Sequence, residues 1–207
     1  MLFRSPYLAG CTTIDSALFN DDLWQEQLGI GFDKLTYVKT GEKLDADSFA
    51  KYRNDGGLII IDSIPEQAVI DCLRSPIAMM GSDALRGHPR AAGACARVLG
   101  HYVRERGILT AMEAIRKMTL LPAQRLESAS SHMKARGRLR VGAVGDLCVF
   151  DPMTIKDCAT YTNPTLPSQG IVHVLVNGTF VVRHGTLLPM DTSTKLPGQA
   201  IRAPIRD

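Results

Sequence analysis

Residues 57–83 read GLIIIDSIPEQAVIDCLRSPIAMMGSD, and this stretch decides the predicted fold. The run at 57–61 is short, apolar and rich in β-branched side chains, which is typical of a strand buried on both faces. Residues 63–66 fit a capping box with proline in the first turn, and the helix would end near Leu73. A second apolar run at 77–80 completes a strand–helix–strand pattern, which predicts a parallel sheet.

One acidic side chain, Asp83, follows the second predicted strand after a glycine and a serine. In parallel α/β folds, polar residues just past the carboxyl ends of strands build the active site. Aspartate is also a common cap of a following loop or helix. Position alone therefore leaves Asp83 with either a catalytic or a capping role.

Helices are predicted on both sides of this stretch. Their expected ranges are 16–28, 45–52, 91–106, 110–118 and 121–128. Asp45 is a plausible cap of the second helix, and Thr110 with Glu113 forms a capping box at the start of the fourth. Up to residue 128 the pattern is therefore α/β.

The composition changes after a polar break at 128–131, and the chain turns β-rich. Residues 146–150 read as a strand. Two further strands, at 172–176 and 179–183, flank Asn177-Gly178, which is the strongest short hairpin signal. Residues 129–207 are therefore expected to form a small antiparallel β module with an irregular tail.

Length and charge exclude several classes of protein. The 207 residues are 45% hydrophobic, which excludes general disorder, and a net charge of +3 does not indicate a nucleic-acid partner. No apolar run approaches the roughly 18 residues of a membrane helix, and the start has no secretory signal. The length suffices for a core but is short of the roughly 250 residues of a complete (β/α)₈ barrel.

Cysteine and histidine are used sparingly. The five cysteines are widely spaced with no C-x-x-C, which indicates reduced thiols and a cytoplasmic location. The five histidines include no H-x-H and no H-E-x-x-H. The chain thus has no preassembled metal site of a known spacing.

Nine short strings are each weak evidence alone but are informative when their order along the chain is considered. They are MGSD (80–83), HPR (88–90), RVLGHYV (97–103), KMT (117–119), LPA (121–123), GRL (137–139), GDL (145–147), FDP (150–152) and HVLVNG (173–178). In order and spacing they resemble the C-terminal part of the D-aminoacylase family. This family comprises N-acyl-D-amino-acid deacylases of the amidohydrolase superfamily. The resemblance is dense from about residue 57 to residue 185.

The resemblance implies a fold class. It is an α/β metal-dependent hydrolase with a (β/α)₈ barrel and a small β-sandwich built from both chain ends. Residues 1–128 would be a partial barrel with its last strand near 77–81. Residues 129–207 would supply half of the composite sandwich and the tail.

The resemblance also implies a reaction, hydrolysis of a non-peptide C–N amide bond in a small N-acyl amino acid. Asp83 would take a proton from a metal-activated water and deliver one to the leaving amine. Arg90 would bind the substrate carboxylate, because a guanidinium forms a bidentate pair with a carboxylate. His88 is expected to position the loop rather than to bind metal.

The departures from the family pattern bear on activity. Ala84 stands where the family usually has glycine, and the loop from Asp83 to His88 is short. The family uses a divalent metal, expected to be zinc, but no histidine precedes His88, so Asp83 is the sole candidate ligand. One carboxylate falls far short of the four ligands usual for zinc. The chain is therefore expected to be a C-terminal part that is inactive in isolation.

Two alternatives stay open. The chain would be a non-catalytic assembly module if self-association or a partner chain covers the open barrel. It would be an amidohydrolase of other specificity, similar to a hydantoinase or a dihydroorotase, if its substrate lacks a free carboxylate. Arg90 discriminates this last alternative, because a substrate without a carboxylate does not need the guanidinium.

Overall fold

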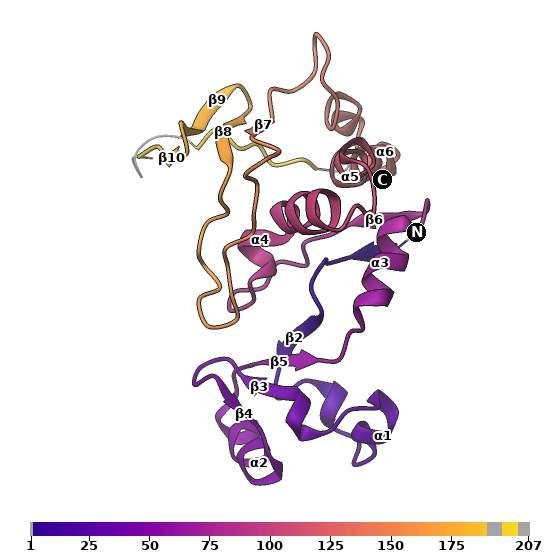
Figure 1. Cartoon of the computed structure of the whole chain (residues 1–207), viewed down its shortest axis with the longest axis vertical. Coiled ribbons are helices and arrows are strands. Elements are labelled where there is room, and N and C mark those ends of the chain that lie inside the picture. Colours follow the sequence, from indigo (N-terminus) through magenta and orange to yellow (C-terminus); the bar gives the residue numbers. More distant parts are fainter. Residues whose placement is uncertain (1, 190–195, 203–207) are drawn as a thin grey trace.

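The computed structural model describes residues 2–189 and 196–202. Figure 1 shows three parts along the long axis: a small sheet with its helices at the bottom, a helical middle part, and a second small sheet at the top. Among the described residues, no helix has the length and apolarity needed to cross a membrane. The predicted irregular tail lies partly outside the described residues.

The lower part is a four-stranded antiparallel sheet in the order β2-β5-β3-β4. Its strands are β2 (Ala9–Thr13), β3 (Leu35–Tyr37), β4 (Glu42–Lys43) and β5 (Leu58–Asp62). It carries two helices, α1 (Trp24–Leu28) and α2 (Ala46–Asp55). We call this part, residues 9–62, the small sheet unit.

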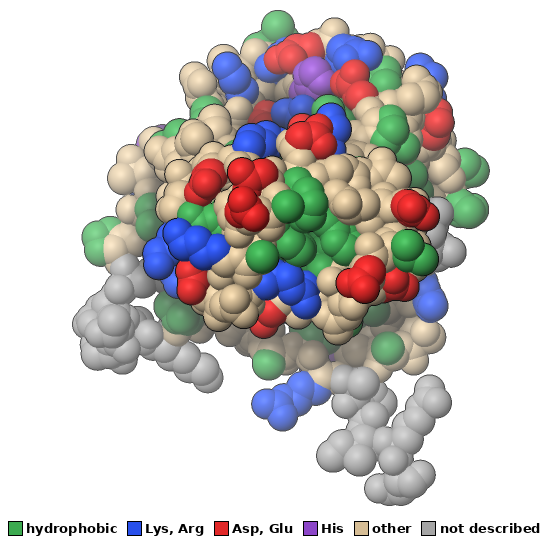
Figure 2. All heavy atoms as spheres, turned by 90° about the horizontal axis from the view of Figure 1, so that it is seen from below, with side chains coloured by type: hydrophobic (Ala, Val, Ile, Leu, Met, Phe, Trp, Pro, Cys, Tyr) green, Lys and Arg blue, Asp and Glu red, His purple; other side chains and the backbone are tan. Residues whose placement is uncertain are grey.

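An aromatic cluster forms the core of the small sheet unit. Its buried members are Ile14, Phe19, Trp24, Leu35, Tyr37, Leu44, Phe49, Tyr52, Ile59 and Ile61. The predicted cap of α2 is confirmed, since Asp45 accepts the backbone N–H of Ser48 at 2.8 Å. Figure 2 views this end of the molecule and shows exposed hydrophobic side chains surrounded by charges of both signs.

The predicted pairing of the two apolar runs is wrong. The run at 57–61 becomes β5, which lies between β2 and β3 and is antiparallel to both. A continuous apolar run marks a strand buried on both faces, and the central place of β5 in its sheet buries it regardless of strand direction. The predicted capping box at 63–66 is also wrong, because α3 (Glu66–Arg74) begins after Pro65 without a side-chain cap.

The second apolar run becomes β6 (Ala78–Met80), which pairs in parallel with β1 (Leu2–Arg4). A parallel pair needs a crossover, and α3, which contacts both strands, provides it. The small sheet unit is therefore an insertion between β1 and α3. Because parallel strands end at the same edge, the segments after β1 and β6 meet there.

The middle part consists of α4 (Arg90–Arg97), the π-helical segment η3 (Val98–Glu105), α5 (Ala111–Met118) and α6 (Leu120–Leu126). The predicted helix at 91–106 is thus continuous but changes to π-helical hydrogen bonding midway. The predicted capping box of α5 is confirmed. Buried Lys117 of α5 donates to the carbonyl oxygen of Ala78 at 3.0 Å, which fastens α5 to β6.

The upper sheet is antiparallel in the order β10-β9-β8-β7. Its strands are β7 (Leu147–Phe150), β8 (Ile171–Val176), β9 (Thr179–Arg183) and β10 (Thr186–Leu187). The predicted hairpin is confirmed: Asn177 and Gly178 join β8 to β9 with φ of 50° and 80°. Two consecutive positive φ angles are typical of a type I′ turn.

Candidate functional site

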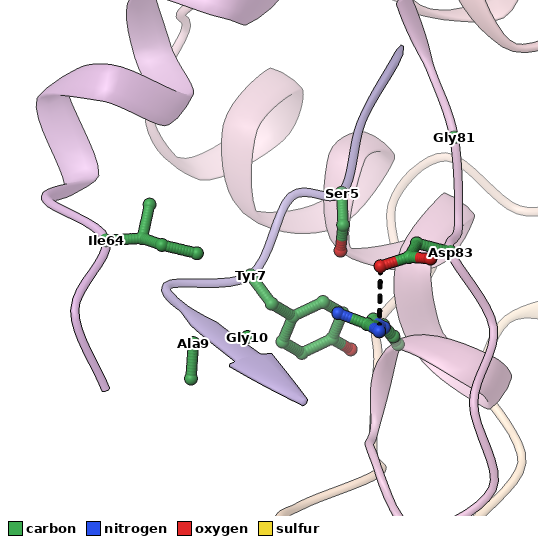
Figure 3. Close-up of a pocket in the computed structure, with 8 residues that line it drawn as sticks. Ser5, Tyr7, Ala9, Gly10, Ile64, Gly81 and Asp83 are labelled. Atoms are coloured by element: carbon green, nitrogen blue, oxygen red, sulfur yellow. Dashed lines mark ion pairs between the residues drawn. The ribbon is translucent and has the colours of Figure 1, made fainter. Parts of the chain in front are cut away.

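A cavity of about 490 Å³ opens where the segments after β1 and β6 meet (Figure 3). It is lined by Ser5, Tyr7, Ala9, Gly10, Ile64, Gly81, Asp83 and Arg90. The lining comes from five places: the segment after β1, the start of β2, the segment between β5 and α3, the segment after β6 and the start of α4. The cavity therefore depends on contacts between segments that are far apart in the sequence.

The two residues singled out from the sequence, Asp83 and Arg90, meet in this cavity. Arg90 Nη2 lies 2.7 Å from Asp83 Oδ2. The Arg90 side chain is only 6% exposed, whereas that of Asp83 is 75% exposed. The guanidinium is thus part of the buried wall and the carboxylate lies at the mouth. Asp83 has a φ of 48°, a left-handed conformation that aspartate tolerates better than most residues.

Two polar atoms of the cavity wall have no hydrogen-bond partner among the described residues. They are Arg90 Nε and Ser5 Oγ, and both are buried. Figure 3 shows the Ser5 hydroxyl pointing toward Asp83. A buried polar group without a partner costs about 1–3 kcal/mol, so such groups indicate a place where a ligand oxygen is accepted.

His88 lies directly behind Arg90 and has no solvent exposure. The Arg90 backbone N–H donates to His88 Nδ1 at 3.0 Å, so Nε2 carries the ring hydrogen and donates to the Ala9 carbonyl oxygen at 3.1 Å. Burial, followed by the charge of Arg90, lowers the pKa of His88 to about 4. His88 is therefore neutral at pH 7.

Tyr7 forms another wall of the cavity, and its hydroxyl is bound on the side away from the cavity. Its hydroxyl donates to Asp157 Oδ2 at 3.1 Å, and Arg97 Nη1 lies 3.3 Å from the same oxygen. Burial, then the charge of Asp157, raises the pKa of Tyr7, so the phenol stays protonated. A Cβ atom on Gly93 would lie 2.4 Å from the Tyr7 hydroxyl, which explains glycine in the middle of α4.

The sequence interpretation missed Ser5, Tyr7 and Asp157. Ser5 and Tyr7 lie in the weakly patterned first 55 residues, and Tyr7 contacts Asp157 across 150 positions. A local pattern carries no signal for such a contact. The glycine at position 93, inside a predicted helix, is a local hint that another segment approaches the helix closely there.

A metal does not fit the donors that this part of the chain offers. Within residues 2–189 and 196–202, no three His, Cys, Asp or Glu side chains are grouped so as to hold a metal ion. Asp83 stands alone, with one oxygen bound to Arg90. Zinc usually takes three or four protein ligands, so Asp83 as a metal ligand stays a prediction.

Comparisons with known proteins show which family the chain belongs to. A model of the amidohydrolase family matches residues 65–182, which is more than half of the chain. The N-acyl-D-glutamate deacylase of Alcaligenes xylosoxydans xylosoxydans is 42% identical over 144 residues, which are 68% of this chain and 27% of that protein. The D-aminoacylase of the same organism is 46% identical over 104 residues, 48% of this chain and 20% of that protein.

Solved structures give the same result. The N-acyl-D-glutamate deacylase from Bordetella bronchiseptica, complexed with zinc and a phosphonate inhibitor, has a TM-score of 0.76 and 32% identity. The likeness covers 98% of this chain and 42% of that one. A D-aminoacylase has a TM-score of 0.75 and 29% identity, over 97% of this chain and 42% of that one. This chain spans less than half the length of these relatives. It belongs to the amidohydrolase family, and its resemblance to the N-acyl-D-amino-acid deacylases is confirmed.

Proposed function

We propose that this chain provides the carboxylate-binding and proton-transfer part of a hydrolase that cleaves the C–N amide bond of N-acyl-D-amino acids. The observation that carries the proposal is the Asp83–Arg90 pair in a cavity at the ends of two parallel strands. Relatives named as deacylases of N-acyl-D-glutamate and N-acyl-D-aspartate support the substrate class.

Arg90 is proposed to bind the free carboxylate of the substrate. Its guanidinium is buried on the cavity wall, and its Nε has no partner among the described residues. A carboxylate accepts two parallel N–H bonds from a guanidinium, which would satisfy Nε as well as a terminal nitrogen. Ser5 Oγ, also unpartnered on this wall, is proposed as a further donor to the carboxylate.

Asp83 is proposed to transfer protons at the scissile amide. The substrate carboxylate would replace Asp83 on Arg90, which frees the exposed Asp83 carboxylate for the reacting atoms. Asp83 would then accept a proton from the attacking water and donate one to the leaving nitrogen as the C–N bond breaks. The products are a carboxylate and a D-amino acid.

The larger architecture is also a proposal. We take β1, α3 and β6 as part of a (β/α)₈ barrel, and the upper sheet as half of a composite β-sandwich. The boundary is proposed between residues 128 and 129. A divalent metal, expected to be zinc, would need donors from polypeptide outside this chain, because the residues described here do not form its site.

The carboxylate role of Arg90 is tested by calorimetric binding of N-acetyl-D-alanine and of its uncharged amide, N-acetyl-D-alaninamide. The wild-type chain is expected to bind the acid about tenfold to a hundredfold more tightly, since hydrogen bonds to charged groups contribute about 1.5–3 kcal/mol. Arg90→Ala should remove this preference, and Arg90→Lys should keep only part of it. Equal binding of acid and amide by the wild type would contradict the proposal and favour a substrate without a carboxylate, as in hydantoinase-like enzymes.

An assembly role is a second candidate, favoured by exposed apolar side chains near the upper sheet. Leu139 is 89% exposed, and Val141, Leu147 and Val149 are exposed as well. β7 is an edge strand among the described residues, and such edges are covered in stable proteins. Light scattering after size-exclusion chromatography tests this role: Val149→Lys should dissociate an assembly, and a monomeric wild type would contradict it.

A further inference from the structure

We propose that His88 is a positioning residue that fixes Arg90 relative to the opposite wall of the cavity, through two hydrogen bonds made by its neutral ring. The expected effect of His88 on ligand binding rests on the proposed function, in which Arg90 binds the substrate carboxylate. The effect of His88 on the position of Arg90 is argued from the contacts of the ring alone.

The two bonds of the His88 ring join residues that line the cavity on different elements. Nδ1 accepts the backbone N–H of Arg90, the first residue of α4. Nε2 donates to the carbonyl oxygen of Ala9, the first residue of β2, which is 79 positions from His88. The imidazole thus links the small sheet unit to the helix that carries the guanidinium.

The packing of the ring leaves it a single orientation. The Tyr7 ring meets it edge-on at a centroid distance of 5.4 Å, and the Tyr161 ring does so at 5.2 Å. With two aromatic walls and no solvent exposure, the ring cannot turn to other partners. A shift of His88 would therefore move Arg90 or Ala9 with it.

Only one protonation state can make both bonds. A hydrogen on Nδ1 would face the Arg90 N–H, so two donors would oppose each other. The charged and titratable groups that face the ring are Arg90, Asp83, Tyr7 and Tyr161. Burial and then the charge of Arg90 disfavour the imidazolium, and the bond to Ala9 and the charge of Asp83 each favour it less strongly. Protonation of His88 should therefore displace Arg90.

Nuclear magnetic resonance of the full 207-residue chain tests the control of Arg90. The Arg90 Nε–H signal reports the position of the guanidinium, and His88→Phe keeps an aromatic ring but removes both bonds. We expect His88→Phe to shift this signal and to weaken the binding of N-acetyl-D-alanine about tenfold. His88→Asn, whose Oδ1 can replace Nδ1 as acceptor, should bring the signal back toward that of the wild type. A wild-type signal in His88→Phe would mean that packing alone positions Arg90, and it would overturn the proposal.

The wild type gives a second test that needs no core substitution. The His88 ¹⁵N signals should show a protonated Nε2 and an unprotonated Nδ1 at pH 7, and the Arg90 Nε–H signal should shift with the same midpoint as His88 on acidification. The titration is repeated in Asp83→Asn, so that Asp83 cannot cause the shift. An Arg90 Nε–H signal that does not shift when His88 is protonated would overturn the proposal. Failure of N-acetyl-D-alanine to bind the wild type would instead refute the proposed function, while these signals still decide the role of His88.

Discussion

Arg90 carries a buried guanidinium whose ion-pair partner among the described residues is the exposed carboxylate of Asp83. In the proposed reaction, the substrate carboxylate takes the place of Asp83. The internal pair therefore competes with the substrate, and the same contact keeps the buried charge paired while the cavity is free of substrate. Such competition gives each of the two residues a separate, measurable effect on binding.

Asp83→Asn should tighten the binding of N-acetyl-D-alanine, because it removes the competing carboxylate and asparagine also tolerates the left-handed backbone at this position. The gain is expected to be about fivefold, because solvent screens the exposed carboxylate of the pair and such a contact contributes about 1 kcal/mol. Calorimetric titration of the variant and of the wild type with N-acetyl-D-alanine measures this gain in affinity. Weaker binding by the variant would mean that Asp83 helps to hold the substrate rather than competing with it.

His88 should make the free energy of unfolding depend on pH. Its pKa is about 4 in the folded chain and about 6.5 when unfolded, so between these values the unfolded chain takes up the proton. Stability contributed by the neutral ring is complete above pH 6.5 and falls as the pH is lowered toward 4, by up to about 3 kcal/mol. Urea unfolding at pH 7 and pH 4.5 measures it, with His88→Gln as the variant in which this component should vanish. An equal pH dependence in the two proteins would exclude His88 as its source.

Some residues of the cavity can be predicted from a local sequence pattern, and others cannot. Asp83, in the string MGSD, is indicated both by its position after a strand and by the family pattern, whereas Arg90, in HPR, is indicated by the family resemblance alone. Ser5 and Tyr7 reach the same cavity only because β1 pairs with β6, 76 positions further along the chain at Leu2 and Ala78. No local pattern in the first residues indicates that pairing.

At the scale of elements, α5 offers a test of capping. Thr110→Ala should lower the free energy of unfolding by about 1 kcal/mol, because Thr110 Oγ1 accepts the backbone N–H of Glu113 at 3.2 Å. Thr119→Ala at the other end of the same helix is the matched control and should cost less than about 0.5 kcal/mol. Urea unfolding compares the two variants, and equal losses would rule out a specific capping effect.

The sequence predicted several elements but not every partner. It did not predict β1 to β4, and the helix expected at 16–28 is a short 3₁₀ turn at Ala17–Phe19 followed by α1. β5, α3 and β6 all occur where their patterns indicated, yet β5 belongs to an antiparallel sheet and β6 to a parallel pair. Burial on both faces determines the composition of a strand, and the direction of its neighbours does not. The hairpin at Asn177-Gly178 was predictable because its turn chemistry is local.

At the scale of the whole molecule, the donors for a metal decide activity. We expect the isolated chain with added zinc to show no hydrolysis of N-acetyl-D-amino acids, because no three candidate ligands gather within the described residues. Release of free D-amino acid measures this, with a known D-aminoacylase as the positive control. Turnover that disappears in Asp83→Asn would contradict this expectation and would reveal a site assembled in another way.

The most direct measurement is a crystal structure of the chain with N-acetyl-D-alanine. We expect the ligand carboxylate on Arg90, bonded through Nε and a terminal nitrogen and within reach of Ser5 Oγ, with Asp83 released toward the amide. A ligand bound elsewhere, or Arg90 still paired with Asp83 at saturating ligand, would contradict the assignment of this cavity as the carboxylate-binding site.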